Sequence, residues 1–487
     1  MYYSLILLLA FLVVMIAVGV WGMKKTSTLG DFFLGGRTLG PWMSSFAYGT
    51  TYFSAVIFIG FAGKQGWGFG FNALWIGVEN AIFGAFLAWF VLGKRTRRMT
   101  QRLNVMTMPE YLEARYGSEH LKMVAAVLIF IFMLPYSASV FKGLGHLFES
   151  TFHISYDFAL IVLVGITGVY LILGGYFAVT LTDFIQGFIM LAGAILMLVV
   201  LVAKAGGPAD AIATVAQNYP QHVPLDKQPN WLTIGSLIFM TSFGTWGLPQ
   251  MVQKFYAIKD EKIVPRAAII TGVFALVIGV CAYSTGILSH AFFNNDTVPR
   301  LASGGVNFDL IIPTLLTAHL PEMLLALIML LVLSASMSTL SSLILVSSSA
   351  ITIDLYKGYL HPEVDEKKSL LMIRALSGVF IVCSFAISKM QIGFIVTLMS
   401  LSWGVLSGAF MAPYILGLFW KGVTKAGAYA GFVGGAGTAI ALFFVLGPSQ
   451  SPLASSVAMV VPFAIVPLVS LVTPKVDKKT IDSAFGS

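Results

Sequence analysis

The sequence predicts an all-α polytopic membrane protein with thirteen transmembrane helices. Of its 487 residues, 57% are hydrophobic and only 10% are charged, so a soluble fold would have too little polar surface. Apolar runs of about 20 residues, enough to cross a bilayer as a helix, recur along the whole chain. Lys and Arg gather in alternate connections between these runs, as expected when a chain crosses the membrane repeatedly.

The expected spans follow one another through mostly short connections. They cover residues 2–22, 41–63, 71–93, 121–147, 155–174, 180–203, 231–255, 266–289, 321–350, 371–388, 391–420, 426–446 and 454–473. The first run has no basic residue before it and Lys24-Lys25 after it, whereas a signal peptide would show the reverse. We therefore expect a retained first span that enters from the outside.

The basic residues support this orientation. With the N-terminus outside, 23 of the 29 Lys and Arg fall on the inner side. The exceptions are Lys64, Lys142, Lys204, Lys227, Arg300 and Lys389. The sequence therefore predicts a plasma (cell inner) membrane protein with its C-terminus in the cytoplasm, in contact with the lipid bilayer. The net charge of +8 reports this topology rather than nucleic-acid binding.

Four connections are long enough to carry structure of their own. The inner connection 94–120 includes a charged helical stretch, and the outer connection 205–230 is expected to form a short helix after Pro208. The outer connection 290–320 is rich in Gly and Asn and is expected to cover a vestibule, whereas 354–370 is expected to be a plain connector. The two cysteines lie in apolar runs, which argues against disulfides and thiolate metal sites.

Two spans are expected to be interrupted in mid-membrane. Residues 46–54 in the second span and 240–249 in the seventh combine Gly, hydroxyl residues and, in the seventh, Pro. They lie five spans apart, at matching places of an inverted repeat of spans 2–6 and 7–11. Unwound backbone there would free carbonyl groups to coordinate a cation. The alternative is that Gly and Pro are simply frequent in membrane helices.

The ninth span has one hydroxyl-rich face. At about 100° per residue, Ala335, Ser338, Thr339 and Ser342 fall in one stripe, with Ser341 beside it. Small polar residues also serve close helix packing, which is the alternative. The hydroxyls exceed what packing needs, and neutral oxygens suit a hard, singly charged cation. The stripe therefore predicts sodium coordination.

Two acidic residues lie within or at the edge of apolar runs. Asp183 is near the inner end of the sixth span, and Glu79 is in the third. Carboxylates inside a membrane are costly and mark functional sites. Asp183 is favoured as a cation ligand over a boundary residue in contact with water. For Glu79 a functional role and a structural role are about equally favoured.

Several longer segments resemble one family. The chain is similar to the sodium:solute symporters, and among them to the bacterial sodium/proline symporters. The resemblance is carried by residues 31–37, 136–139, 147–152, 174–183, 338–341 and 348–357. It implies a five-plus-five inverted-repeat core of the amino acid/sodium symporter type, with one helix before it and two after. It also implies sodium-driven uptake of a small organic solute by alternating access.

This resemblance divides the chain into five parts. They are 1–40 (first span and inner loop), 41–204 (first repeat), 205–230 (outer loop), 231–420 (second repeat) and 421–487 (last two spans and cytoplasmic tail). No nucleic acid and no obligate protein partner is implied.

The resemblance also implies two candidate sodium sites. The first would consist of the carbonyls of Thr50, Phe53 and Ala335 with the hydroxyls of Ser338 and Thr339.

The second site, present in some members of the family, would consist of Asp183, Ser338, Ser341 and Ser342. In the proline symporters the position of Ser342 resembles a cysteine, so this chain departs toward the two-sodium pattern. Sodium is thus the expected coupling ion, with one or two ions per cycle and the serine favouring two.

The substrate side matches the family less closely. Tyr52 stands where the proline symporters have an acidic residue, and Thr241 and Thr245 stand where they have aromatic residues. The expected substrate-binding residues are Ser54, Tyr136, Thr241, Thr245, Trp246 and Glu79. The expected solute is an amino acid such as proline, with a monocarboxylate or another small organic solute as the alternative.

Other classes of function fit the sequence less well. A sodium-permeable channel would need a continuous polar lining, whereas polarity here clusters at the broken spans. A nontransporting sensor would be expected to carry an appended soluble domain. An enzyme is not expected, because there is no paired-carboxylate metal motif, no His-Glu-x-x-His, no Gly-x-Ser-x-Gly, and the seven histidines are scattered.

Overall fold

The chain folds into a bundle of long helices. In the computed structural model, residues 2–25, 29–173 and 176–486 are described, and these described residues include no β-strand beyond two isolated bridges. Gly174 and Gly175, which belong to one of the family-like segments, lie outside them. The prediction of an all-α fold is confirmed for the described residues.

Eleven of the thirteen expected spans correspond to one continuous helical segment each. These segments are α1 (Tyr2–Lys25); α5 (Ala73–Glu79) continued by the π-helical segments η4 (Asn80–Leu87) and η5 (Trp89–Gly93); α8 (Glu119–Phe152); α9 (Tyr156–Leu173); α10 (Tyr176–Lys204); α14 (Val264–Phe292); α16 (Glu322–Ser349); α17 (Glu366–Lys389); α18 (Ile395–Phe419); α19 (Lys425–Leu446); and α20 (Ser451–Val472). Within the described part of the chain, nine helices are long and apolar enough to cross a membrane.

The second and seventh spans are interrupted, as the sequence predicts. In the second, α3 (Pro41–Tyr52) ends, Phe53 and Ser54 are not helical, and the chain continues as η2 (Val56–Phe61) and α4 (Ala62–Phe69). In the seventh, α12 (Trp231–Phe243) passes through the 3-10 turn η7 (Gly244–Trp246) into α13 (Pro249–Tyr256). Pro249 lacks an amide hydrogen, so it begins a helix but cannot continue one.

The expected loops contain further helices. Helix α11 (Pro208–His222) confirms the helix expected after Pro208, and α15 (Phe308–His319) lies in the Gly- and Asn-rich outer connection 290–320. The charged inner connection forms α6 (Lys94–Arg102) and α7 (Met108–Tyr116). The remaining short elements are α2 (Leu29–Leu34), η1 (Gly35–Arg37), η3 (Gly70–Asn72), η6 (Leu225–Lys227), η8 (Glu261–Ile263), η10 (Pro448–Gln450) and α21 (Lys478–Phe485).

The expected end of the ninth span is wrong. The helix continues beyond residue 350 as the π-helical segment η9 (Ala350–Leu360), so the first residues of the expected connector 354–370 are helical. Asp354 on this extension is buried and accepts a hydrogen bond of 2.6 Å from the Thr107 hydroxyl at the start of α7. This buried hydrogen bond holds the helical extension against the start of α7.

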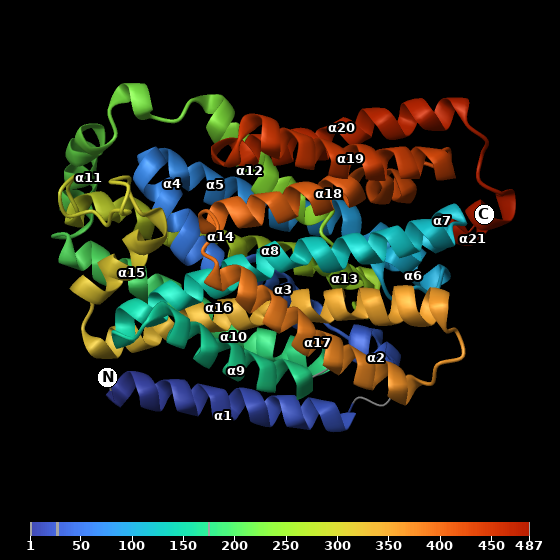
Figure 1. Ribbon diagram of the computed structural model, residues 1–487, viewed down its shortest axis with the longest axis horizontal. Helices are drawn as coiled ribbons and strands as arrows, with labels where there is room; N and C mark the ends of the chain where they lie inside the picture. The colour runs from blue at the N-terminus through green and yellow to red at the C-terminus, as the bar shows by residue number, and fades with distance from the viewer. Residues whose placement is uncertain (1, 26–28, 174–175, 487) are drawn as a thin grey trace.

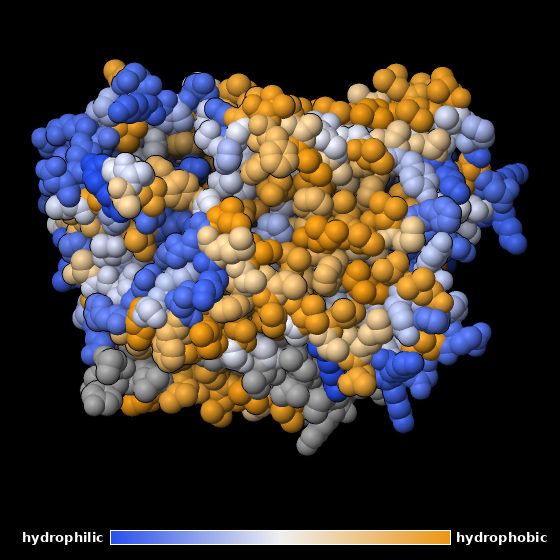
Figure 2. Space-filling view, in the orientation of Figure 1, coloured by the Kyte–Doolittle hydropathy of each residue, from blue (hydrophilic) through white to orange (hydrophobic). Residues whose placement is uncertain are grey.

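The long helices run in a common direction, with polar segments at both ends. Figure 1 shows α11, α15 and the N-terminus at one end, and α6, α7, α21 and the C-terminus at the other. Figure 2 shows a broad hydrophobic band between two hydrophilic ends. Large apolar side chains such as Phe444 and Leu471 are exposed on α19 and α20. An apolar band with exposed side chains is what a bilayer covers.

Helix α16 lies at the centre of the bundle. In its most apolar window 83% of the residues are buried inside the protein, against 22% in α19. It packs against α1, α3, α8 and α10. Its hydroxyl-rich stripe is therefore enclosed by other helices rather than exposed to lipid.

Candidate functional site

The broken end of α3 presents backbone carbonyls to the hydroxyl stripe of α16. The carbonyls in the last turn of a helix have no amide partner within it, and the helix dipole makes that end electronegative. In a continuous helix the Ala55 amide would serve the Thr51 carbonyl, but here it donates to Ser336 Oγ at 3.1 Å. The interruption thus releases carbonyl oxygens inside the bundle.

Several oxygen atoms converge on the Thr339 hydroxyl. Its Oγ1 lies 3.3 Å from the Thr50 carbonyl oxygen, 3.2 Å from that of Thr51 and 3.1 Å from that of Ala335. One hydroxyl hydrogen serves one of these three acceptors at a time. The cluster therefore has more acceptors than donors, which is the arrangement that suits a cation.

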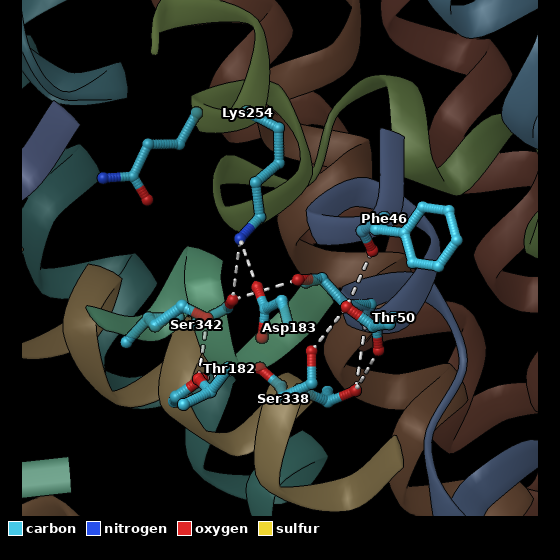
Figure 3. Close-up of polar contacts among 12 residues, drawn as sticks. Phe46, Thr50, Thr182, Asp183, Lys254, Ser338 and Ser342 are labelled. Atoms are coloured by element: carbon cyan, nitrogen blue, oxygen red, sulfur yellow. Dashed lines mark hydrogen bonds and ion pairs between the residues drawn. The ribbon is translucent and has the colours of Figure 1, made fainter. Parts of the chain in front are cut away.

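The other predicted residues of the first sodium site lie beside this cluster. Ser338 Oγ is 2.7 Å from Thr50 Oγ1, and both side chains are fully buried. Figure 3 shows Ser338 and Thr50 facing one another across the two helices. Phe53 is the residue that caps α3, directly after its last turn. The structure thus brings Thr50, Ser338, Thr339 and Ala335 together at the break, with Phe53 adjoining them in the chain.

Two of the residues predicted for the second sodium site, Asp183 and Ser342, contact a lysine. Asp183, on α10, is completely buried, and its Oδ2 lies 3.7 Å from Nζ of Lys254 on α13. The same ammonium donates a hydrogen bond of 3.0 Å to Ser342 Oγ on α16. Both contacts are visible in Figure 3. A buried carboxylate requires a compensating charge, and here an ammonium lies against it.

Two details determine how this second cluster is assembled. The Ser341 hydroxyl donates to the Ser338 carbonyl at 2.8 Å, so it bonds within its own helix. Gly187, one turn beyond Asp183, lies against Phe46 and Thr50, and a Cβ at this position would collide with the Phe46 ring. The absence of a side chain at Gly187 therefore allows α10 to approach α3.

A small pocket adjoins the break in the second span. Ser54, Tyr136 and Thr241 contribute to its wall, and the empty space between its lining residues, including space open to solvent, is about 300 Å³. The other lining residues are Tyr52, Phe53, Val56, Ile57, Phe61, Asn80, Tyr283, Met399 and Trp403. None of these residues carries a formal charge.

Three of the six predicted substrate residues do not line this pocket. Thr245 donates to the Gly84 carbonyl at 3.1 Å, and Trp246 Nε1 donates to the Phe83 carbonyl at 2.9 Å. These bonds join the seventh span to the third. Glu79 is half-buried on α5. The side chain of the next residue, Asn80, lines the pocket instead.

Sequence reasoning missed Lys254 and Asn80. Asn80 Oδ1 accepts hydrogen bonds from Thr241 at 2.8 Å and from Ser242 at 3.0 Å, so it orients the pocket wall formed by the seventh span. Asn80 could have been found from the sequence because it is a polar residue in the middle of a predicted span. Lys254 could have been found because it is an ionisable residue within the predicted seventh span.

The sequence matches a family of known transporters. The model of the sodium:solute symporter family matches residues 32–435. The high-affinity proline transporter PutP of Bacillus subtilis strain 168 is 31% identical, over 88% of this chain and 89% of its own length. The sodium/proline symporter 2 of Staphylococcus saprophyticus is 30% identical, over 88% of this chain and 84% of its own length.

Solved structures show the same fold. A sodium-coupled sialic acid symporter in a substrate-bound outward-open state superposes with a TM-score of 0.81 at 18% identity, covering 98% of both chains. A nucleobase-cation-symport-1 family transporter in a closed conformation superposes with a TM-score of 0.56 at 14% identity, covering 93% of this chain and 98% of the other. The family match over most of the sequence establishes that this multi-pass membrane protein belongs to the sodium:solute symporter family.

Proposed function

We propose that this protein is a sodium-coupled symporter that takes up a small amino acid, proline first among the candidates, by alternating access. The observation that carries this proposal is the convergence of free carbonyl and hydroxyl oxygens at the break of α3, beside an uncharged pocket. An ion bound there would neutralise the electronegative helix end and hold α3 against α16. The protein is a carrier in this proposal and not an enzyme.

The first sodium site consists of Thr50, Phe53, Ala335, Ser338 and Thr339. The carbonyls of Thr50 and Ala335 already lie within 3.3 Å of the Thr339 hydroxyl, and the Thr50 and Ser338 side chains are in contact. Phe53 also lines the pocket, so the ion and the solute share one wall. Binding of either ligand would order the interrupted backbone for the other, which is a physical route to coupling.

The second candidate site comprises Asp183 with Ser338, Ser341 and Ser342. Its carboxylate and the Ser342 hydroxyl face one position, which in this structure holds the Lys254 ammonium. We assign these residues to a buried cation position, which the Lys254 ammonium occupies here, and sodium remains the coupling ion of the protein.

The uncharged pocket favours a solute without net charge. An amino acid zwitterion meets that requirement, and two relatives about 30% identical are named as proline carriers. A monocarboxylate would bring a negative charge into the pocket, and the pocket wall has no positively charged side chain to balance it. Ser54, Tyr136 and Thr241 are assigned to the solute, whereas Thr245, Trp246 and Glu79 are assigned to the support of the third and seventh spans.

The membrane topology of the proposal has thirteen spans with the N-terminus outside and the C-terminus in the cytoplasm. Residues 41–204 and 231–420 form the two inverted repeats, preceded by 1–40, joined by 205–230 and followed by 421–487. The matching breaks in the second and seventh spans support this division. Single cysteines replacing Asn295 and Lys367, in a variant without Cys281 and Cys383, should react with an impermeant maleimide from outside and from inside, respectively.

Uptake into proteoliposomes tests the function. Labelled proline should accumulate with an inward sodium gradient and should not with an equal potassium gradient. Accumulation with both gradients, or with neither, would contradict the proposal. A single-channel current far above carrier turnover would favour the sodium-permeable channel. Proline binding without any flux would favour a nontransporting sensor.

A further inference from the structure

The ammonium of Lys254 lies in the middle of the cluster formed by Asp183 and Ser342. Its Nζ is 3.0 Å from Ser342 Oγ and 3.7 Å from Asp183 Oδ2. The two charged side chains are 1% and 0% exposed, so neither exchanges its partner for water in this structure. Three helices meet here, because Lys254 belongs to α13, Asp183 to α10 and Ser342 to α16.

The position of Lys254 follows from the interruption of the seventh span. Helix α13 begins at Pro249, and Lys254 lies in its last turn, directed toward the gap between α10 and α16, as Figure 3 shows. A lysine ammonium carries the same single positive charge as a sodium ion and donates hydrogen bonds to oxygen. The ammonium therefore balances the negative charge of the Asp183 carboxylate and gives the Ser342 hydroxyl a polar partner. A bound sodium ion would do the same.

Hydrogen bonds connect this ammonium to the first sodium site. Ser342 Oγ lies 3.0 Å from Thr51 Oγ1, and the Thr51 carbonyl lies 3.2 Å from the Thr339 hydroxyl. The chain from Lys254 to Thr339 thus passes through Ser342 and Thr51 only. A sodium ion cannot occupy the place of the ammonium without displacing it, because two like charges at contact distance in a buried site repel strongly.

We infer that Lys254 is a tethered cation that takes the place of a second sodium ion, so that the protein couples one sodium ion to each solute molecule. The inference rests on the proposed function and specifies its stoichiometry. The sequence pattern of Asp183 and Ser342 favoured two ions, and the ammonium between them reverses that expectation. The second cluster then serves to join α13 to α10 and α16, and the first site alone binds the driving ion.

The test measures the number of charges moved with each proline. Proteoliposomes are held at known membrane potentials and sodium gradients, and the potential at which net flux of labelled proline vanishes gives the number of sodium ions per solute. The wild type should give one. A value of two in the wild type overturns the inference and leaves the proposed function intact. A proline flux that ignores sodium overturns both.

A variant without the ammonium sharpens the test. Lys254→Met leaves Asp183 without its cation, so sodium should enter the cluster, raising the Hill coefficient for sodium and the charge per proline from one toward two. Combining Lys254→Met with Asp183→Asn should return both values to one. If Lys254→Met transports with one charge per proline, the inference is wrong. The wild-type measurement decides the matter if this variant does not fold.

The matched control removes a different buried lysine. Lys142 Nζ on α8 lies 2.9 Å from Asp309 Oδ2 on α15, and both side chains are almost completely buried. Both residues of this pair belong to helices other than α10, α13 and α16, which carry the Asp183 cluster. Lys142→Met should therefore leave the stoichiometry at one. A change to two in this variant would show that the effect does not depend on the place of Lys254, which would also overturn the inference.

Discussion

Two clusters on the same stripe of α16 balance charge in opposite ways. Around Thr339 the contacts are neutral carbonyl and hydroxyl oxygens, whereas around Ser342 an aspartate and a lysine are paired. Neutral oxygens at a helix C-terminus gain both a ligand and a charge when an ion binds. A carboxylate beside an ammonium is already compensated. Neighbouring hydroxyls of one helix can thus serve ion binding and helix assembly separately.

The largest expected effect comes from breaking the charged cluster on one side only. Asp183→Asn leaves the Lys254 ammonium buried without a counter-charge, which should lower the free energy of unfolding by about 3–5 kcal/mol. Denaturation of the purified protein in detergent measures this change. The double variant Asp183→Asn/Lys254→Met should recover part of the loss. A single variant as stable as the wild type would show that the pair is not the stabilising element we take it for.

Breaking the neutral cluster should change ion binding rather than stability. Thr339→Ala removes one hydroxyl from the converging oxygens, and one lost ligand costs about 1–3 kcal/mol, or about a 5- to 150-fold higher half-saturating sodium concentration. Sodium-dependent proline uptake measures it. Ser349→Ala is the matched control, because that hydroxyl on α16 donates only to the Val346 carbonyl of its own helix. Equal sodium dependence in both variants would contradict the assignment.

The smallest expected effect separates the pocket from both cation clusters. Thr241→Val removes the donor to Asn80 Oδ1, so the affinity for proline should fall by about fivefold, corresponding to about 1 kcal/mol. The half-saturating sodium concentration at saturating proline should stay unchanged. Thr245→Val is the control, since that hydroxyl bonds to backbone carbonyls outside the pocket wall. A larger loss of proline affinity in the control would mean that the pocket lies nearer to η7.

The stoichiometry also sets how far a solute can be concentrated. One sodium ion gains about 2.3 kcal/mol in crossing 100 mV, and a tenfold sodium gradient adds about 1.4 kcal/mol. One ion therefore supports roughly a 500-fold accumulation of a neutral solute, and two ions support roughly a 10⁵-fold accumulation. A tethered ammonium in place of the second ion lowers the maximal accumulation of the solute, and it halves the number of sodium ions that enter with each solute molecule.

Local sequence patterns were sufficient to predict the main elements of the site. The periodicity of Ser338 and Thr339 predicted one face of α16, and that face meets α3. Residues that interrupt helices, Pro249 among them, predicted both breaks. These features depend on near neighbours in the chain, so helical geometry alone is enough to interpret them.

Contacts between distant spans could not be predicted in the same way. Lys254 appeared as one more basic residue at the inner end of a span, and only the packing of α13 against α10 and α16 brings it to Asp183. The pocket wall likewise joins Asn80, Tyr283 and Trp403 from three separate spans. The side chain of Thr245 was placed in this wall from a resemblance, whereas the turn η7 directs it to the Gly84 carbonyl.

Direct counting of bound sodium tests the central claim, that the neutral cluster binds an ion and the charged cluster needs none. Equilibrium binding of radioactive sodium to the purified wild-type protein should give one ion per chain. Thr339→Ala should lose that ion at sodium concentrations that saturate the wild type. Two ions per chain in the wild type, or one ion that Thr339→Ala binds equally well, would contradict the claim.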